Sequence, residues 1–173
     1  MRYRTGLAVR CFALGVLALL VLAPAWAEDP VAEYEAIKRA SLKGLEALAV
    51  IVPPLNMDAG CRRVSQEELQ AEVEARLDDA GIQVGLGTAT HLIIAVTAFE
   101  PVKDLLCGVS MTVALQQVVL LVRDPRIMTF GVTWEHAGLG VATPVRVAEH
   151  LRRMLAHMVD EFIAIYRDQN PKQ

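Results

Sequence analysis

The chain is poor in the residue patterns that build most catalytic sites. Its 173 residues include three serines and four histidines, and no serine has the flanking glycines of a hydrolase nucleophile. Two glycine-rich hexapeptides, GLGTAT at 85–90 and GLGVAT at 138–143, lack the longer glycine pattern and the lysine of phosphate-binding loops. We interpret both hexapeptides as turns between packed elements. We therefore expect no catalytic residues, no cofactor and no enzymatic activity.

Basic residues and long apolar runs are also scarce. The 17 Lys and Arg residues are outnumbered by 20 Asp and Glu residues, whereas DNA, RNA and anionic lipid surfaces require concentrated positive charge. No apolar stretch reaches the roughly 20 residues of a transmembrane helix. We therefore expect no nucleic-acid partner and no stable membrane anchor in the mature protein.

The first 27 residues have the pattern of a secretory signal peptide. Three arginines precede an uncharged run of 13 residues, Cys11 to Ala23, and the small residues Ala25 and Ala27 occupy the −3 and −1 positions of a cleavage site. We predict cleavage after Ala27, a single domain over residues 28–173, and a periplasmic or secreted location.

Two cysteines, Cys61 and Cys107, remain after this cleavage. An oxidising compartment makes a disulfide the default for an even pair, although two separate thiols are the alternative. If the first strand runs parallel to the strand ending at Phe99, the loops that carry the two cysteines leave the same end of the sheet. The bond would then stabilise the fold by about 3–4 kcal/mol through loop entropy.

The first half of the chain predicts two helices and a buried strand. An amphipathic pattern spans 31–42, and an apolar run at 45–52 before Pro53-Pro54 is typical of a strand. Ser65 and Glu68 form a capping-box pattern, with Val64 and Leu69 as its hydrophobic staple. A helix should therefore run from about Gln66 to Ala80.

The second half predicts further strands and a long helix. Strands are expected at 82–84, 91–99 and 109–122, the last with a bulge near Gln116-Gln117, and a returning strand at 128–135 completes an antiparallel hairpin. Thr143-Pro144 predicts a helix start and Asn170-Pro171 its end. The order predicts an α+β fold, a mixed four- to five-stranded sheet with helices packed mainly on one face. The predicted core includes Val50, Ile94, Val113, Val132, Leu151 and Phe162.

One ridge of the last helix carries possible metal ligands. His150, His157 and Glu161 follow one another at spacings of seven and four, and the last two could share an ion. His136 could join a site at the end of the hairpin. Because His and Glu commonly cover the edge of an amphipathic helix, we interpret these residues as surface cover and expect no metal centre. Any further role of the ridge stays open.

The layout resembles known envelope domains. The segments ALAVIVPPL, LDDAGIQVG and HLIIAVTAF, followed by a long hairpin, are similar in arrangement to the amino-terminal domain of TolB and to the outer-membrane lipoproteins that activate penicillin-binding proteins. With its TW strand and a final helix ending in NP, the chain also resembles small uncharacterised exported bacterial proteins. The resemblance implies an envelope adaptor that binds a partner protein.

Two functions follow as hypotheses. The first is a periplasmic interaction domain without catalytic activity, which contacts an unidentified envelope protein through a strand edge or a helix surface. The second is a binder of a small apolar or lipidic ligand between the sheet and the last helix. Its support is four adaptable methionines, Met111, Met128, Met154 and Met158. The oligomeric state stays open.

Overall fold

The computed structural model describes residues 29–85 and 87–171. The predicted signal peptide, 1–27, lies outside the described residues, so its cleavage remains a prediction. The chain separates into two compact units after Tyr34. The architecture described below is that of the second unit, which begins at Glu35. Helix α2, Pro30–Ala40, crosses this division and begins and ends close to the predicted 31–42.

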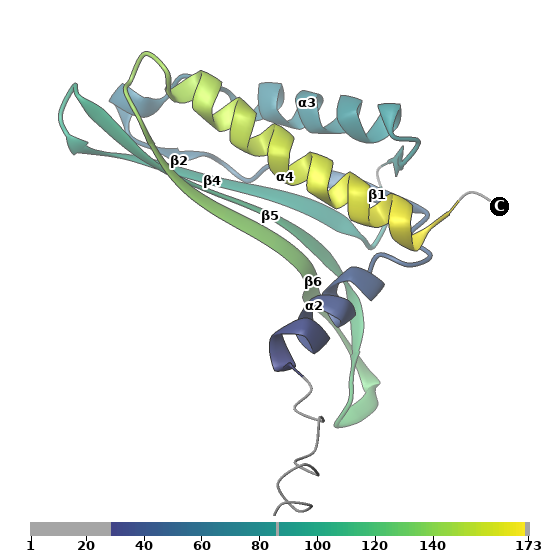
Figure 1. Cartoon of the computed structure of the whole chain (residues 1–173). Coiled ribbons are helices and arrows are strands. Elements are labelled where there is room, and N and C mark those ends of the chain that lie inside the picture. The colour runs from purple at the N-terminus through teal and green to yellow at the C-terminus, as the bar shows by residue number, and fades with distance from the viewer. Residues whose placement is uncertain (1–28, 86, 172–173) are drawn as a thin grey trace, which may run out of the picture. The chain divides into compact units, whose positions relative to one another are not determined.

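The fold is α+β and is built on one mixed sheet (Figure 1). The strand order is β3-β1-β4-β5-β6, and the short β2 pairs with β4. β1 and β2 run parallel to β4, whereas β4, β5 and β6 form an antiparallel meander. The bounds are β1 Ala47–Ile51, β2 Asn56–Met57, β3 Gln83–Val84, β4 His91–Val102, β5 Leu106–Leu121 and β6 Asp124–Ala142.

Helices α3, Gln66–Asp79, and α4, Val147–Gln169, cover the same face of the sheet (Figure 1). The predicted capping box starts α3: the Glu68 backbone N–H donates to Ser65 Oγ, and the Ser65 N–H donates to the Glu68 carboxylate, both at 3.1 Å. α4 turns a broad apolar stripe toward the strands. In the part of the chain that the structure describes, no helix is long and apolar enough to cross a membrane.

The core lies between these two helices and the sheet. Five of the six predicted core residues are buried there, as are Leu92, Met111 and Leu155. Val132 is the exception, because its side chain is 55 % exposed. Its prediction as a core residue is wrong.

A β-bulge explains the error at Val132. Leu115 pairs with Trp134, and the next residue, Gln116, pairs with Val132, so Thr133 is an extra residue in β6. An extra residue reverses the alternation of side chains beyond it. Trp134 therefore lies in the core at 1 % exposure, whereas Val132 faces the other side. The ladder is interrupted where the sequence predicted it, but the inserted residue belongs to β6 and not to β5.

The hexapeptide at 138–143 is not a turn. β6 continues through Ala142, and α4 begins at Val147 instead of Pro144. Gly138 and Gly140 lie under α4, where an added Cβ would lie 2.6 Å from Met158 Cε or would collide with His150 Nε2. Because glycine has no side chain, α4 can lie close to β6 at these two positions, which explains the glycines there.

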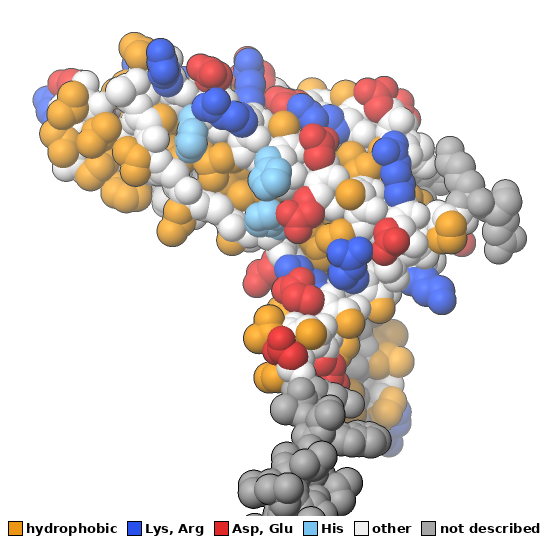
Figure 2. All heavy atoms as spheres, viewed as in Figure 1, with side chains coloured by type: hydrophobic (Ala, Val, Ile, Leu, Met, Phe, Trp, Pro, Cys, Tyr) orange, Lys and Arg blue, Asp and Glu red, His pale blue; other side chains and the backbone are white. Residues whose placement is uncertain are grey.

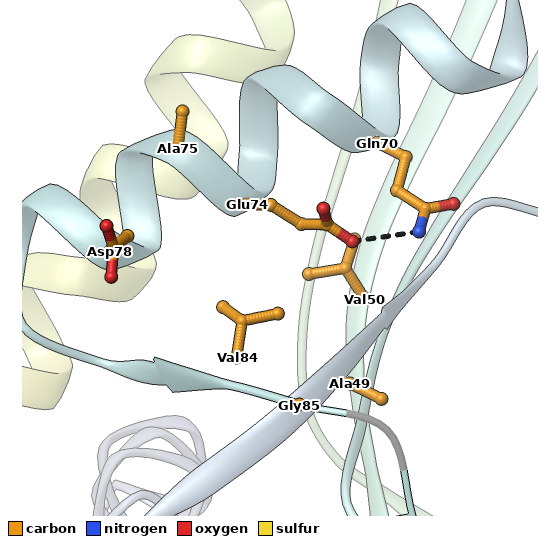
Figure 3. Close-up of a pocket in the computed structure, with 8 residues that line it drawn as sticks. All are labelled: Ala49, Val50, Gln70, Glu74, Ala75, Asp78, Val84 and Gly85. Atoms are coloured by element: carbon orange, nitrogen blue, oxygen red, sulfur yellow. Dashed lines mark hydrogen bonds between the residues drawn. The ribbon is translucent and has the colours of Figure 1, made fainter.

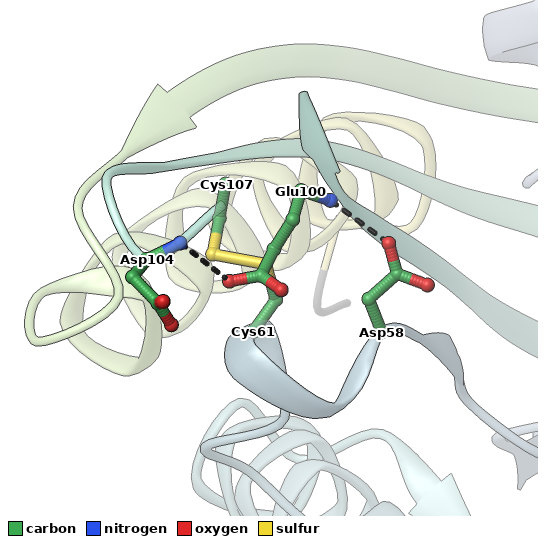
Figure 4. The surroundings of a disulfide bond; sticks show 5 residues. All are labelled: Asp58, Cys61, Glu100, Asp104 and Cys107. Carbon is green, nitrogen blue, oxygen red and sulfur yellow. Dashed lines mark hydrogen bonds between the residues drawn. A yellow bond between two sulfur atoms is a disulfide. The ribbon is translucent and has the colours of Figure 1, made fainter. Parts of the chain in front are cut away.

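A disulfide joins Cys61 to Cys107 across 46 positions, with their Cα atoms 5.8 Å apart (Figure 4). Cys61 ends a 3-10 turn, Ala59–Cys61, and Cys107 lies at the start of β5. A hydrogen bond lies near the disulfide as well: the Glu100 N–H donates to Asp58 Oδ2 at 2.9 Å. The parallel pairing of β1 with β4 brings the two connections to one end of the sheet, as the predicted disulfide required.

Candidate functional site

The face of the sheet opposite α3 and α4 is strongly apolar. We call it the open face. It carries the side chains of β4, β5 and β6 that alternate with the core residues of these strands. Its large exposed members are Phe99, Val118, Leu120, Met128, Phe130, Val132, Leu139 and Val141. The register places them in two groups, Phe99, Leu139 and Val141 near one end of the strands and the other five near the β5–β6 hairpin tip, with polar residues of the same phase between them. Exposed groups of large apolar side chains often mark a binding site.

β6 is an edge strand of the sheet and contributes side chains to the open face. It is the last strand in the sheet order, and among the residues that the structure describes no strand pairs with its other side. Between Met128 and Ala142 the strand carries no lysine, arginine or proline, the residues that usually protect an exposed edge. Figure 2 shows hydrophobic side chains gathered at the upper left end of the sheet.

Charge is sparse on the open face. In the paired stretches of β4, β5 and β6, Glu135 is the one Asp, Glu, Lys or Arg residue of the outward phase, which also carries His91. Phe130 stacks with His91 across the sheet, with ring centroids 6.0 Å apart. Charge is concentrated instead at the hairpin tip, where the Arg126 guanidinium donates to both Asp124 oxygens and lowers the pKa of that carboxyl. The open face therefore suits an apolar or uncharged partner segment.

A separate hollow of about 590 Å³ lies between α3 and the strands β1 and β3 (Figure 3). Its floor is apolar, with Val50 and Val84, but its helix side carries the carboxylates of Glu74 and Asp78. Glu74 accepts a hydrogen bond from Gln70 at 2.8 Å. This lining of mixed polarity fits an apolar or lipidic ligand poorly, because such a ligand would remove the two carboxylates from water, which is costly.

The four methionines of the ligand hypothesis do not line one cavity. Met111 and Met158 are buried in the core, and Met154 packs against it. Met128 lies on the open face at the far side of the sheet and is 69 % exposed. Between the sheet and α4 the structure places packed side chains, among them Leu151 and Phe162.

The structure brings together only part of the predicted ridge of α4. His157 and Glu161 are joined by His136 from β6, and one ligand atom from each residue lies within 4.8 Å of the others. His150 lies apart from them against Gly140. The strand was expected to end at Glu135, whereas β6 continues through Ala142 and keeps His136 in phase with the core residue Trp134.

The open face itself was not predicted as a surface. A strand edge was expected only in general terms, and Val132 was expected in the core. The signal that could have found the open face is composition: the outward phases of β4, β5 and β6 carry almost no charge.

No protein-family model and no curated protein matches this sequence. Among solved structures, the fold has a weak likeness to a hypothetical protein from Chlamydia trachomatis. The TM-score is 0.42 and the sequence identity 9 %, over 69 % of this chain and 96 % of that chain. A likeness at this level carries no argument about function, and it neither supports nor opposes the resemblance in layout to TolB.

Proposed function

We propose that this protein is an interaction domain of the bacterial envelope that acts without catalysis. Its open face and the edge of β6 would bind an extended apolar segment of another envelope protein. The observation that carries the proposal is that β6 has both exposed apolar side chains on the open face and an edge with which no described strand pairs. The resemblance in layout to TolB and to the lipoprotein activators supports the same class of function.

Strand addition is the binding mode that suits this surface. A segment paired with β6 would satisfy backbone groups along the edge, and its alternate side chains would extend the open face. Leu139 and Val141 are 85 % and 64 % exposed and lie on that face of β6, so they are the natural contacts for those side chains. Main-chain pairing then supplies affinity, and the apolar contacts supply selectivity.

The periplasmic location is part of the proposal. The amino-terminal sequence supports it, and the Cys61–Cys107 disulfide is consistent with an oxidising compartment. Reducing cytosol would not maintain such a bond in an ordinary bacterial protein.

A pull-down from envelope extract with the tagged mature protein tests the proposal. We expect one stoichiometric protein partner with the wild type, and its loss when Leu139 and Val141 are both replaced by lysine. The matched control is Arg153→Glu on α4, where the side chain is 68 % exposed on the other face of the sheet. Both variants should keep the urea midpoint of the wild type, because neither change touches the core.

Three results would contradict the proposal. One is the absence of any stoichiometric partner. Another is a partner that the double lysine variant still binds, and the third is a partner that Arg153→Glu loses equally. Lipid extracted with the purified protein would favour the ligand hypothesis instead.

A further inference from the structure

Three side chains with metal-binding atoms meet where β6 passes beneath α4. His136 comes from β6, and His157 and Glu161 come from successive turns of α4. His136 Nδ1 lies 2.7 Å from Glu161 Oε2, and the imidazole rings of His136 and His157 have centroids 5.7 Å apart. Figure 2 shows histidine side chains gathered on this flank of the molecule beside an acidic one.

The surroundings of His136 suit a cation. Its Nδ1 is buried and has no hydrogen-bond partner among the described residues. The contact with Glu161 is short enough for an ion pair, but the two atoms are not aligned as a hydrogen bond. A buried polar atom without an aligned partner is uncommon, since it loses its water without replacement. A cation on that nitrogen would supply the partner.

The donor set fits a divalent transition metal. Two imidazole nitrogens and one carboxylate form a known zinc donor set, and a water completes the coordination. Tetrahedral zinc with bonds of about 2.0–2.1 Å holds its ligand atoms about 3.3 Å apart. Because the three donor atoms lie within 4.8 Å of one another and His157 is exposed, small side-chain rotations suffice to reach this spacing.

We propose that His136, His157 and Glu161 bind one divalent transition-metal ion, with Zn²⁺ as the first ion to test. The ion would link the edge strand to α4, two elements that otherwise meet through side-chain packing. This site lies on the helix side of the sheet, apart from the open face. The inference therefore goes beyond the proposed interaction function and does not depend on it.

The alternative is a simple His136–Glu161 ion pair with His157 as a neighbour. The two explanations differ in what His157 does, because the ion pair does not need it and the metal site does. His157 is exposed, so replacing it should not disturb folding.

Isothermal titration of the metal-stripped mature protein with ZnCl₂ distinguishes them. We expect one ion per chain in the wild type, and binding at least tenfold weaker in His157→Ala and in Glu161→Gln. His91→Gln is the matched control, since it removes a histidine from the opposite face of the sheet and should bind like the wild type.

A second readout follows the proposed link between strand and helix. Zn²⁺ should raise the melting temperature of the wild type and of His91→Gln, but not that of His157→Ala. The proposal is overturned if the wild type binds no ion at stoichiometric ratio. It is equally overturned if His157→Ala binds as tightly as the wild type, or if His91→Gln loses binding to the same degree.

Discussion

Replacing Cys61 and Cys107 together by alanine should lower the free energy of unfolding by about 4 kcal/mol. The bond closes a loop of 46 positions, and the loop-entropy relation gives about 4 kcal/mol for a loop of that length at 25 °C. The folded structure around the two cysteine positions should persist without the bond. The Asp58 N–H still donates to the Ala98 carbonyl and the Glu100 N–H to the Asp58 carboxylate, both at 2.9 Å. The loss should therefore arise mainly in the unfolded chain.

Urea unfolding followed by circular dichroism measures this loss. With a slope of about 2 kcal/mol per molar urea for a domain of this size, the midpoint should fall by about 2 M. Dithiothreitol should lower the midpoint of the wild type by a similar amount and leave the double alanine variant unchanged, which controls for effects of the reductant on the rest of the protein.

Two results would refute the reasoning. Thiol titration of the unfolded, unreduced mature protein could find two free cysteines, in which case the bond does not form. Alternatively, the bond could be present while its loss moves the midpoint by less than about 0.5 M, a shift worth about 1 kcal/mol on the same slope. The unfolded chain would then retain enough structure near the two cysteines to make the cross-link redundant.

Two further substitutions test the packing of α4 on the sheet. Phe162 is fully buried and meets Trp134 edge to face at 5.2 Å, so Phe162→Ala should cost about 3–5 kcal/mol of unfolding free energy in urea; a loss below about 1 kcal/mol would show that α4 does not dock there. Gly140→Ala should cost about 1–3 kcal/mol, because the new Cβ collides with the His150 ring, whereas Gly138→Ala meets only flexible methionine tips and should cost less; equal costs would contradict the close approach at Gly140.

Local signals in the sequence were enough to predict several parts of the fold. The capping box at Ser65 needs only residues three apart, and it was found with the correct start of α3. The parallel placement of the first strand beside the strand ending at Phe99 was assumed for the predicted disulfide, and the structure has β1 parallel to β4. The α+β class is confirmed as well, with the two-residue β2 as one strand more than predicted.

Features that depend on pairing could not be derived in the same way. Contacts between the paired strands decide which of them receives the extra residue of a bulge. The apolar pattern of the β6 sequence is compatible both with a bulge and with a regular strand. The closeness of Gly138 and Gly140 to α4 is likewise a tertiary fact, because a glycine-rich stretch is equally typical of a turn. His136 was not assigned to His157 and Glu161, because which part of β6 passes beneath α4 is also a tertiary fact.

The bulge at Thr133 also determines how far the open face extends. Beyond it, Met128, Phe130 and Val132 turn away from the helix side and join the face that already carries Leu139 and Val141. Without the inserted residue, those three side chains would have pointed toward the side of Trp134.

Contacts from other parts of the chain reach the bulge: Ser41 Oγ lies 3.1 Å from the Thr133 carbonyl and 2.7 Å from the Lys38 carbonyl, and Gln117 Nε2 donates to the Ser41 carbonyl at 3.2 Å. The bulge is therefore held by specific contacts, as expected of a built feature of the fold. Because it puts Met128, Phe130 and Val132 on the same face as Leu139 and Val141, it is also the local feature on which the proposed binding surface most depends.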